Sequence, residues 1–382
     1  MLSTSGFDRR LLGGLSPEQF LKRYWQKKPF LIRGATPDFR PITTERLFQL
    51  AKADDVESRL VSHSRGAWQI EHGPFASFPR RKSNWTLLVQ GVNLHDEAGD
   101  ALMRRFSFIA NTRLDDLMVS YAVDGGGVGP HFDNYDVFLL QVEGRRRWRI
   151  SAQKDLELLD DAPLKILRDF RAQQEFVLDP GDMLYLPPQI AHEGVALGAC
   201  MTYSIGFRAP GFQEVVREFL IDQAERISLS GRYRDPLRRP ARLPAQLDTN
   251  FIDSMSRRIN ALRWTQIDVV DFIGRYMTEP KAQVYFERNE SLSAARFIKR
   301  ASATGLKLHP KTQMLYRGAR FFINGESFKP TARTETLRRL ANTRCLSASD
   351  CAELARELQT LNLLLEWYAA GWLTQLAAPI TK

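Results

Sequence analysis

The chain has 382 residues, of which 43% are hydrophobic, and it carries a formal net charge of +10. This length exceeds one ordinary domain and the composition suffices for buried cores, so a disordered chain and a small disulfide-built scaffold are excluded. The three cysteines show neither disulfide-framework nor metal-ligand spacing, and we expect reduced thiols in a cytoplasmic protein. The N-terminus lacks a secretory apolar core and no segment approaches roughly eighteen uninterrupted apolar residues, so we expect no membrane association.

The positive charge favours acidic or nucleic-acid-rich surroundings, and an ordinary basic protein is the alternative. The arginines of residues 232–244, RYRDPLRRPARLP, are not interleaved with stacking aromatic side chains. We therefore predict a solvated linker there and no specific nucleic-acid binding.

The first predicted elements are a helix and a strand. Ser16 is a suitable N-cap and Pro17 suits the first helical position, and a strand is expected over residues 30–33. From about residue 56 to 210 the pattern is that of many short strands separated by Gly, Pro and Asp turns, which favours a sandwich or barrel. The predicted strands are WTLLVQGV, LMVSYAV, DVFLLQV, RRWRIS, QEFVL, DMLYLP and MTYSIGF.

After Pro210 the apolar period changes to that of a helix. The first stripe comprises Phe212, Val215, Val216, Phe219 and Leu220. A second helical region follows at residues 251–277, and its apolar faces exceed what one isolated helix pair could bury, so we expect a homodimer. The last hundred residues contain a hairpin with Asn324-Gly325 at its turn and two further helical stretches, which predict a separate small α+β domain.

The candidate site lies in GPHFDNYDVFLLQVEGRRRWRI, residues 129–150. If this run is a strand, His131 and Asp133 point to one face, into the interior of a barrel. His192 follows a Pro-rich bend in PGDMLYLPPQIAHEG and supplies a third ligand. Two histidines and a carboxylate form the facial triad of non-heme Fe(II) oxygenases. The His-x-Asp pair alone is a weak signal, and the glycine run before it and the Gly-Asp-strand-Pro-Pro-His context strengthen it.

The arginines of RRRWR suit a second task. A 2-oxoglutarate cosubstrate leaves one carboxylate deep in the barrel, where a guanidinium is the best partner. Arg146 shares a face with Trp148 and Ile150, so we predict that it points inward; the alternative is that all four arginines are solvated. Ser204 either touches the cosubstrate or is a local hydrogen-bond partner on its strand.

With these motifs in view, the chain closely resembles the JmjC-type ribosomal oxygenases, 2-oxoglutarate-dependent protein hydroxylases on a double-stranded β-helix. The resemblance runs through SPEQFLKRYWQKKPFLIRGA, GGGVGPHFDNYDVFLLQVEGRRRWRI, PGDMLYLPPQIAHEG and YSIGFRAP, and extends over the whole chain. It implies an α+β chain with a JmjC/cupin catalytic domain (1–210), a helical dimerisation region (211–278) and a winged-helix-like domain (279–382). Motif matching places Fe(II) on His131, Asp133 and His192 and the cosubstrate carboxylate on Arg146.

Within this family, the bacterial branch with this layout is similar to enzymes that hydroxylate C3 of an arginine in the sixteenth protein of the large ribosomal subunit. A substrate guanidinium needs acidic and flat partners, and Asp124, Tyr135 and Asp136 are the nearest candidates in sequence. A turn-forming role before the glycine run is the alternative for Asp124. Two other functions stay open: a JmjC oxygenase acting on another residue type, such as His or Asn, and a catalytically silent cupin-like binding module.

Overall fold

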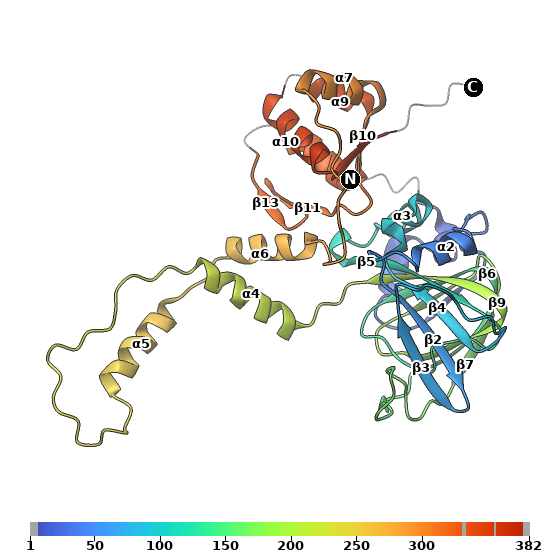
Figure 1. The fold of residues 1–382 in the computed structure, drawn as a ribbon, viewed down its shortest axis with the longest axis horizontal. Coiled ribbons are helices and arrows are strands. Elements are labelled where there is room, and N and C mark those ends of the chain that lie inside the picture. Colours follow the sequence, from blue (N-terminus) through green and yellow to red (C-terminus); the bar gives the residue numbers. More distant parts are fainter. Residues whose placement is uncertain (1–6, 331–333, 355–356, 377–382) are drawn as a thin grey trace. The chain divides into compact units, whose positions relative to one another are not determined.

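The computed structural model describes residues 7–330, 334–354 and 357–376. Contacts group the chain into two compact units, each of which is built from separate stretches of sequence (Figure 1). Unit 1 comprises residues 1–209, 280–312 and 342–382, and unit 2 comprises residues 210–279 and 313–341. The three-domain division expected from the sequence stays a prediction, because the segments of the two units alternate along the C-terminal third of the chain.

Unit 1 begins with short helices whose ends follow the sequence signals. Ser16 caps α1 (Pro17–Arg23) in a capping box with Gln19, as its position before Pro17 predicts. Strand β1 (Phe30–Ile32) follows, and α2 (Thr44–Leu50) and α3 (Glu97–Arg104) come later. The same part of the chain also contains three short 3-10 helices, η2 (Arg9–Leu12), η3 (Val92–Leu94) and η4 (Asn111–Arg113).

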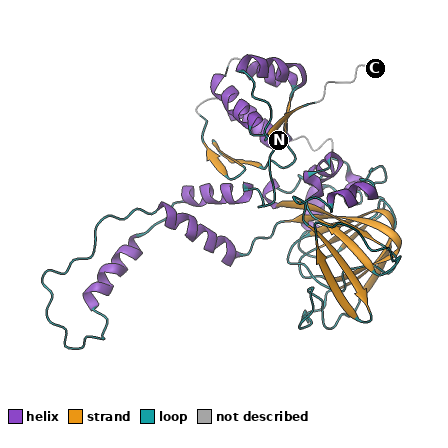
Figure 2. Cartoon of the chain, in the orientation of Figure 1, coloured by secondary structure: helices purple, strands orange, loops and turns teal. Residues whose placement is uncertain are grey.

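The centre of unit 1 is a curved antiparallel sheet, which the described residues build from nine strands (Figure 2). Their order is β1-β8-β6-β9-β5-β4-β2-β3, with β7 paired to β6. The strands after β1 are β2 (Ser58–Ser64), β3 (Ala67–His72), β4 (Trp85–Val89), β5 (Leu114–Ala122), β6 (Val137–Ser151), β7 (Gln174–Leu178), β8 (Met183–Leu186) and β9 (Ala191–Phe207). The segments DVFLLQV and RRWRIS form one strand, β6, whose pairing with β9 shifts register around Glu143.

The two faces of this sheet have different surroundings. One face packs against the N-terminal helices in a large core, where the Phe20 ring lies 5.0 Å from Tyr185 and 5.4 Å from Phe138 between centroids. Leu87 and Val119 belong to the same core, whereas their strand neighbours Leu88 and Ser120 point to the other face and line a cavity. The alternation of side chains along each strand thus gives one apolar face and one cavity face.

Unit 1 also contains the helices and short strands of the chain's last part. These are α7 (Ala294–Thr304), β10 (Leu306–Leu308), β14 (Cys345–Leu346), α9 (Ala348–Leu354), α10 (Leu358–Ala369) and β15 (Leu373–Gln375). The strands form a sheet in the order β14-β10-β15. Phe297 of α7 is fully buried, with its ring 5.4 Å from Tyr368 of α10.

Unit 2 consists of helices and one three-stranded sheet. Its elements are α4 (Phe212–Arg226), α5 (Thr249–Ala261), α6 (Gln266–Thr278), β11 (Met314–Arg317), β12 (Arg320–Ile323), β13 (Glu326–Phe328) and α8 (Thr334–Thr343), whose last two residues belong to unit 1. The predicted hairpin is confirmed: Asn324 and Gly325 both have positive φ (47° and 86°) between β12 and β13. Residues 234–246 are exposed and lie outside helices and strands. Among the described residues, no helix combines the length and the apolarity that crossing a membrane requires.

Candidate metal centre and active site

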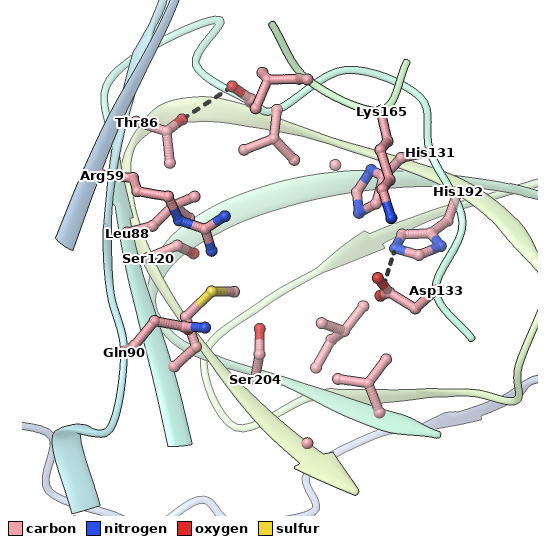
Figure 3. A pocket seen from close by; sticks show the side chains of 18 of the residues that line it. Arg59, Thr86, Leu88, Gln90, Ser120, His131, Asp133, Lys165, His192 and Ser204 are labelled. Carbon is pink, nitrogen blue, oxygen red and sulfur yellow. Dashed lines mark hydrogen bonds and ion pairs between the residues drawn. The ribbon is translucent and has the colours of Figure 1, made fainter. Parts of the chain in front are cut away.

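The cavity on the inner face of the sheet has a volume of about 640 Å³ and contains the predicted site (Figure 3). His131, Asp133 and His192 lie on one side of it, and Arg59, Leu88 and Ser120 lie on the other. A volume of this size suits a small-molecule cosubstrate together with one substrate side chain.

His131, Asp133 and His192 come together as the sequence predicts. One potential ligand atom from each lies within 4.8 Å of those of the other two. The Nε2 atom of His192 is 3.8 Å from Oδ2 of Asp133, and the two imidazole rings are 4.2 Å apart between centroids. The three side chains are therefore close enough together to bind one metal ion.

The local structure that brings them together differs from the expected strand. Residues between β5 and β6 form a glycine-rich loop, and His131 pairs with His192 only through an isolated antiparallel bridge. Their backbones exchange two hydrogen bonds of 2.9 and 2.7 Å, and Gln189 N–H donates to the carbonyl of Asp133. The expectation of a continuous strand through His131 was therefore wrong, because Gly125 and Gly129 adopt left-handed conformations that interrupt the ladder.

Both histidines present the same nitrogen to the cavity. Nδ1 of His131 lies 2.9 Å from the carbonyl of Gly129, and Nδ1 of His192 lies 2.9 Å from that of Ile190. A carbonyl only accepts, so in the neutral form of each ring Nδ1 carries the proton and Nε2 has the lone pair. Burial, assisted by the neighbouring His131, lowers the pKa of His192 to about 4, so this ring is neutral at pH 7 and ready to bind a cation.

Arg146 points inward from β6, as the alternation along the strand predicts. It is 4% exposed, and its face also carries the buried Trp148 and Ile150. Nη1 donates to Oγ of Ser120 at 3.0 Å, while Nε and Nη2 are buried without a hydrogen-bond partner. Unpaired buried N–H groups are rare in folded proteins, so the geometry leaves two donors for a carboxylate.

The other arginines of this run have different surroundings. Arg145 is exposed, and Arg149 is half-buried and forms an ion pair with Glu193 of the neighbouring strand β9. Only Arg146 of the group lines the cavity. The alternative in which all four arginines are solvated is excluded.

Two serines complete this part of the cavity. Ser204, the predicted contact on β9, is 8% exposed and lines the cavity (Figure 3). Ser120 on β5 was not predicted, although the Arg146 contact makes it the closer neighbour of the guanidinium. It belongs to LMVSYAV, and no sequence signal distinguishes its hydroxyl from that of other strand serines.

The three predicted substrate contacts have different positions. Tyr135 lines the cavity and is 41% exposed, and burial together with the Asp133 carboxylate raises its pKa. Asp124 is not a cavity-lining residue: its Oδ1 accepts from the Gly198 N–H at 2.8 Å. Asp136 is also outside the cavity.

Asp136 is fully buried in a polar network. Its carboxylate accepts from Tyr185 Oη at 2.6 Å and from Gln26 Nε2 at 2.9 Å, and Arg113 lies 3.5 Å away. Tyr135 lines the cavity and the adjacent Asp136 does not, so proximity in sequence to the candidate ligands did not decide which residues reach the cavity.

Two acidic residues of β5 line the cavity and were not predicted. Asp115 forms ion pairs with Arg208 and Lys281 at 3.3 and 3.4 Å. Asp116 accepts from the Gly91 N–H at 3.1 Å and has no ion-pair partner within 4 Å among the described residues. Burial raises the pKa of Asp116, and the Lys281 ammonium opposes this shift. The signal available in the sequence was an acidic pair that opens an otherwise apolar strand, LDDLMVS.

Fold and site together define the class of protein. Residues 101–215 match the model of the JmjC domain, and residues 261–374 match that of a ROXA-like winged helix. The sheet with a His-Asp-His set and a buried arginine on its inner face is therefore that of a JmjC-type oxygenase. The donor set, two imidazoles and a carboxylate, fits Fe(II), and the free donors of Arg146 fit the distal carboxylate of 2-oxoglutarate.

Two proteins with sequences similar to this chain have names that describe oxygenases acting on the ribosome. The ribosomal protein uL16 3-hydroxylase of Escherichia coli K12 is 44% identical over 239 residues, which cover 62% of this chain and 64% of the relative. A probable ribosomal oxygenase of Haemophilus influenzae is 37% identical over 227 residues, covering 56% of this chain and 55% of the relative. These alignments span less than two thirds of either relative.

Solved structures match over a greater length. The crystal structure of E. coli YcfD has a TM-score of 0.84 and 33% identity, covering 94% of this chain and 98% of that one. YcfD, described as a ribosomal oxygenase in complex with cobalt and 2-oxoglutarate, matches with a TM-score of 0.81 at the same identity and coverage. The chain belongs to the ribosomal oxygenase family of JmjC-domain proteins.

Proposed function

We propose that this protein is an Fe(II)- and 2-oxoglutarate-dependent hydroxylase that modifies C3 of an arginine in uL16, the sixteenth protein of the large ribosomal subunit. One observation carries this proposal. A single cavity contains three side chains that can bind a metal ion, His131, Asp133 and His192, together with the buried Arg146 guanidinium, whose Nε and Nη2 have no hydrogen-bond partner. The names of the relatives support the choice of substrate. Ribosomal proteins are made and assembled in the cytoplasm, which is where we expect the enzyme to act.

His131, Asp133 and His192 hold the metal in this proposal. Bound there with 2-oxoglutarate and dioxygen, Fe(II) supplies an oxidant strong enough to replace an unactivated C–H bond by C–OH. The carbonyls that fix both Nδ1 protons orient the imidazoles, and burial keeps His192 neutral so that protons do not compete for its Nε2.

Arg146 anchors the distal carboxylate of the cosubstrate. Ser120 holds one corner of the guanidinium, which leaves Nε and Nη2 for a bidentate contact. Ser204 lines the same space and supplies a further hydroxyl. Arg146 would thus hold the distal carboxylate of a bound 2-oxoglutarate, and its keto acid end would be left for the metal held by His131, Asp133 and His192.

The substrate guanidinium is held by Asp116 and Tyr135. Asp116 is the cavity-lining acid of β5 without an ion-pair partner, whereas Asp115 already has two. A bound guanidinium would favour the ionised form of Asp116, whose pKa burial raises. The half-exposed ring of Tyr135 provides a flat surface for stacking.

A test uses purified enzyme with Fe(II), 2-oxoglutarate and a peptide from the arginine-containing loop of uL16. Mass spectrometry should find one added oxygen on the arginine, and none when 2-oxoglutarate is withheld. A peptide with lysine in place of arginine keeps the charge but loses the planar fork, so its turnover should fall steeply. Oxygen found only on another residue type would transfer the enzyme to the alternative class of JmjC oxygenases.

We further propose that unit 2 forms a homodimer through its helices. Phe212, Val216 and Leu220 on α4 are 92%, 53% and 46% exposed, and none of the residues of α5 is buried. Such a concentration of exposed apolar side chains normally marks an interface, and twofold pairing of identical helices is the commonest way to cover it.

A further inference from the structure

A second arginine projects into the cavity, from β2 and on the side opposite the three ligand candidates (Figure 3). Arg59 is half-buried, and its Nε is buried without a hydrogen-bond partner. Among the described residues it forms no ion pair within 4 Å, although Asp115, Asp116 and Asp133 line the same cavity. The Nε–H group is therefore a buried donor without an acceptor, and buried donors are normally paired.

The backbone of Arg59 lies two strands away from the backbone of Ser120, which contacts the cosubstrate anchor Arg146. The register partners of Arg59 are His72 on β3 and Leu88 on β4, and Leu88 in turn pairs with Ser120 on β5. Two strand spacings lie between Arg59 and Ser120, about 10 Å between backbones. Arg146 contacts Ser120 directly and already offers two N–H groups. One distal carboxylate is satisfied by Arg146, so Arg59 remains for another group.

The wall on which Arg59 lies is the side of the sheet that ends in a free edge. Strand β3 is the last of the sheet, and it is mostly exposed. Its residues Ile70 and His72 line the cavity beside Arg59. A protein substrate can place one side chain near the metal site only if its backbone stays outside the cavity. The exposed edge strand β3 leaves room for that backbone.

Charge decides what Arg59 contacts there. A substrate guanidinium is repelled by Arg59 and attracted by Asp116 on β5, across the intervening strand β4. A peptide carbonyl oxygen, by contrast, accepts from a guanidinium whatever the charge of the side chains around it, and several parallel N–H groups can hold successive carbonyls.

We propose that Arg59 binds the main chain of the substrate segment, donating to carbonyl oxygens next to the target residue, and so aligns the polypeptide along the β2–β3 hairpin. This inference rests on the proposed protein hydroxylase function. Arg59 is a specificity residue for polypeptide substrates, distinct from the cosubstrate anchor.

The experiment compares Arg59→Gln and Arg59→Lys with the parent enzyme, using a uL16 loop peptide and 2-oxoglutarate as the two varied substrates. Loss of charge-assisted hydrogen bonds should raise the peptide KM by about 10- to 100-fold in Arg59→Gln, with a smaller rise in Arg59→Lys. The KM for 2-oxoglutarate and its slow turnover without peptide should stay within about twofold, which also shows that the variants fold. Arg145→Gln, at an exposed position of β6 outside the cavity and outside this hairpin, is the matched control and should leave the peptide KM unchanged.

A rise in the 2-oxoglutarate KM with an unchanged peptide KM would overturn the assignment and make Arg59 part of the cosubstrate pocket. Equal KM values for parent and Arg59→Gln would also overturn it. Failure of the proposed function looks different, because the parent enzyme itself would then consume 2-oxoglutarate without adding oxygen to the peptide.

Discussion

Arg146 is the residue through which the cosubstrate assignment can be tested most simply. Replacing it by glutamine removes a buried ion-pair partner, and such losses commonly cost about 3–5 kcal/mol, a factor of several hundred or more in affinity. Titration calorimetry should show this loss for 2-oxoglutarate, with metal affinity nearly unchanged. The exposed Arg145→Gln on the same strand is the control; a large effect there and none at Arg146 would reverse the face assignment.

His131 carries the prediction for the metal. His131→Ala removes one of the three proposed ligands, so metal analysis after loading with Fe(II) should show lost binding, and peptide hydroxylation should stop. His95→Ala removes a half-buried histidine outside the cavity and should retain both. Full metal occupancy and normal turnover in His131→Ala would refute the ligand set.

Asp116 predicts a pH dependence of substrate binding. Burial raises its pKa, Lys281 lowers it, and Asp115 and Glu57 add to the rise, so the carboxyl stays protonated further up the pH scale than an exposed aspartate. A guanidinium needs the ionised form, so the peptide KM should fall as pH rises through this pKa and then level off. In Asp116→Asn the KM should be high and this slope should vanish. A slope that persists in the variant belongs to another group.

Individual site residues can be predicted from the sequence where they belong to a local motif or to the alternating face of a strand. The His-x-Asp…His set follows from motif context, and Arg146 follows from strand alternation beside Trp148 and Ile150. Asp124 and Asp136 do not line the cavity, because closeness in sequence does not determine which way a loop side chain points. Arg59 and Asp116 come from strands distant in sequence, and only the pairing of those strands brings them to the cavity.

Among the elements, β9 supports the site through a glycine. A Cβ on Gly194 would lie 2.7 Å from the ring of Trp148, which packs 5.9 Å from the His192 ring. Gly194→Ala should therefore destabilise the fold by about 1–3 kcal/mol and weaken metal binding, because Trp148 must shift. Thermal unfolding tests this against Gly206→Ala on the same strand, where the nearest atoms are 3.6 Å away. Equal melting temperatures for the two variants would contradict the packing argument.

Helix starts and tight turns are predicted well, because each depends on a few residues that are adjacent in sequence. The capping box of Ser16 and the Asn324-Gly325 turn are both short-range features, and both are confirmed. Long-range pairing is harder to predict from the sequence. The sequence pattern indicates two strands where the structure has the single strand β6, which pairs with β9 on both sides of a register shift. Gly144, whose φ is 61°, lies beside this shift. The bridge between His131 and His192 likewise depends on contacts that no local pattern contains.

For the molecule as a whole, the homodimer gives the clearest prediction. Glutamates at Val216 and Leu220, which lie one turn apart on exposed parts of α4, should yield monomers by light scattering at micromolar concentration. Phe219 is unsuitable for this test, because its ring packs within unit 2, 5.4 Å from Phe272 and 5.5 Å from Trp264. A parent protein that is already monomeric would contradict the dimer.

The sequence pattern predicted a region of strands, then a region of helices, then a mixed region. It did not predict which of these regions pack together in one compact unit. Residues 313–341 join the helices of unit 2, while the segments on both sides of them belong to unit 1. Periodicity reports which face of an element is apolar and does not report which partner covers it.

Mass spectrometry of ribosomal proteins from cells is the decisive measurement for the proposal that this enzyme hydroxylates an arginine of uL16. Cells with the gene should contain uL16 with one added oxygen at C3 of a single arginine, and cells without it, or with only the His131→Ala variant, should contain the unmodified residue. Identical uL16 in all three strains, with the added oxygen on another protein or another residue type, would contradict the account.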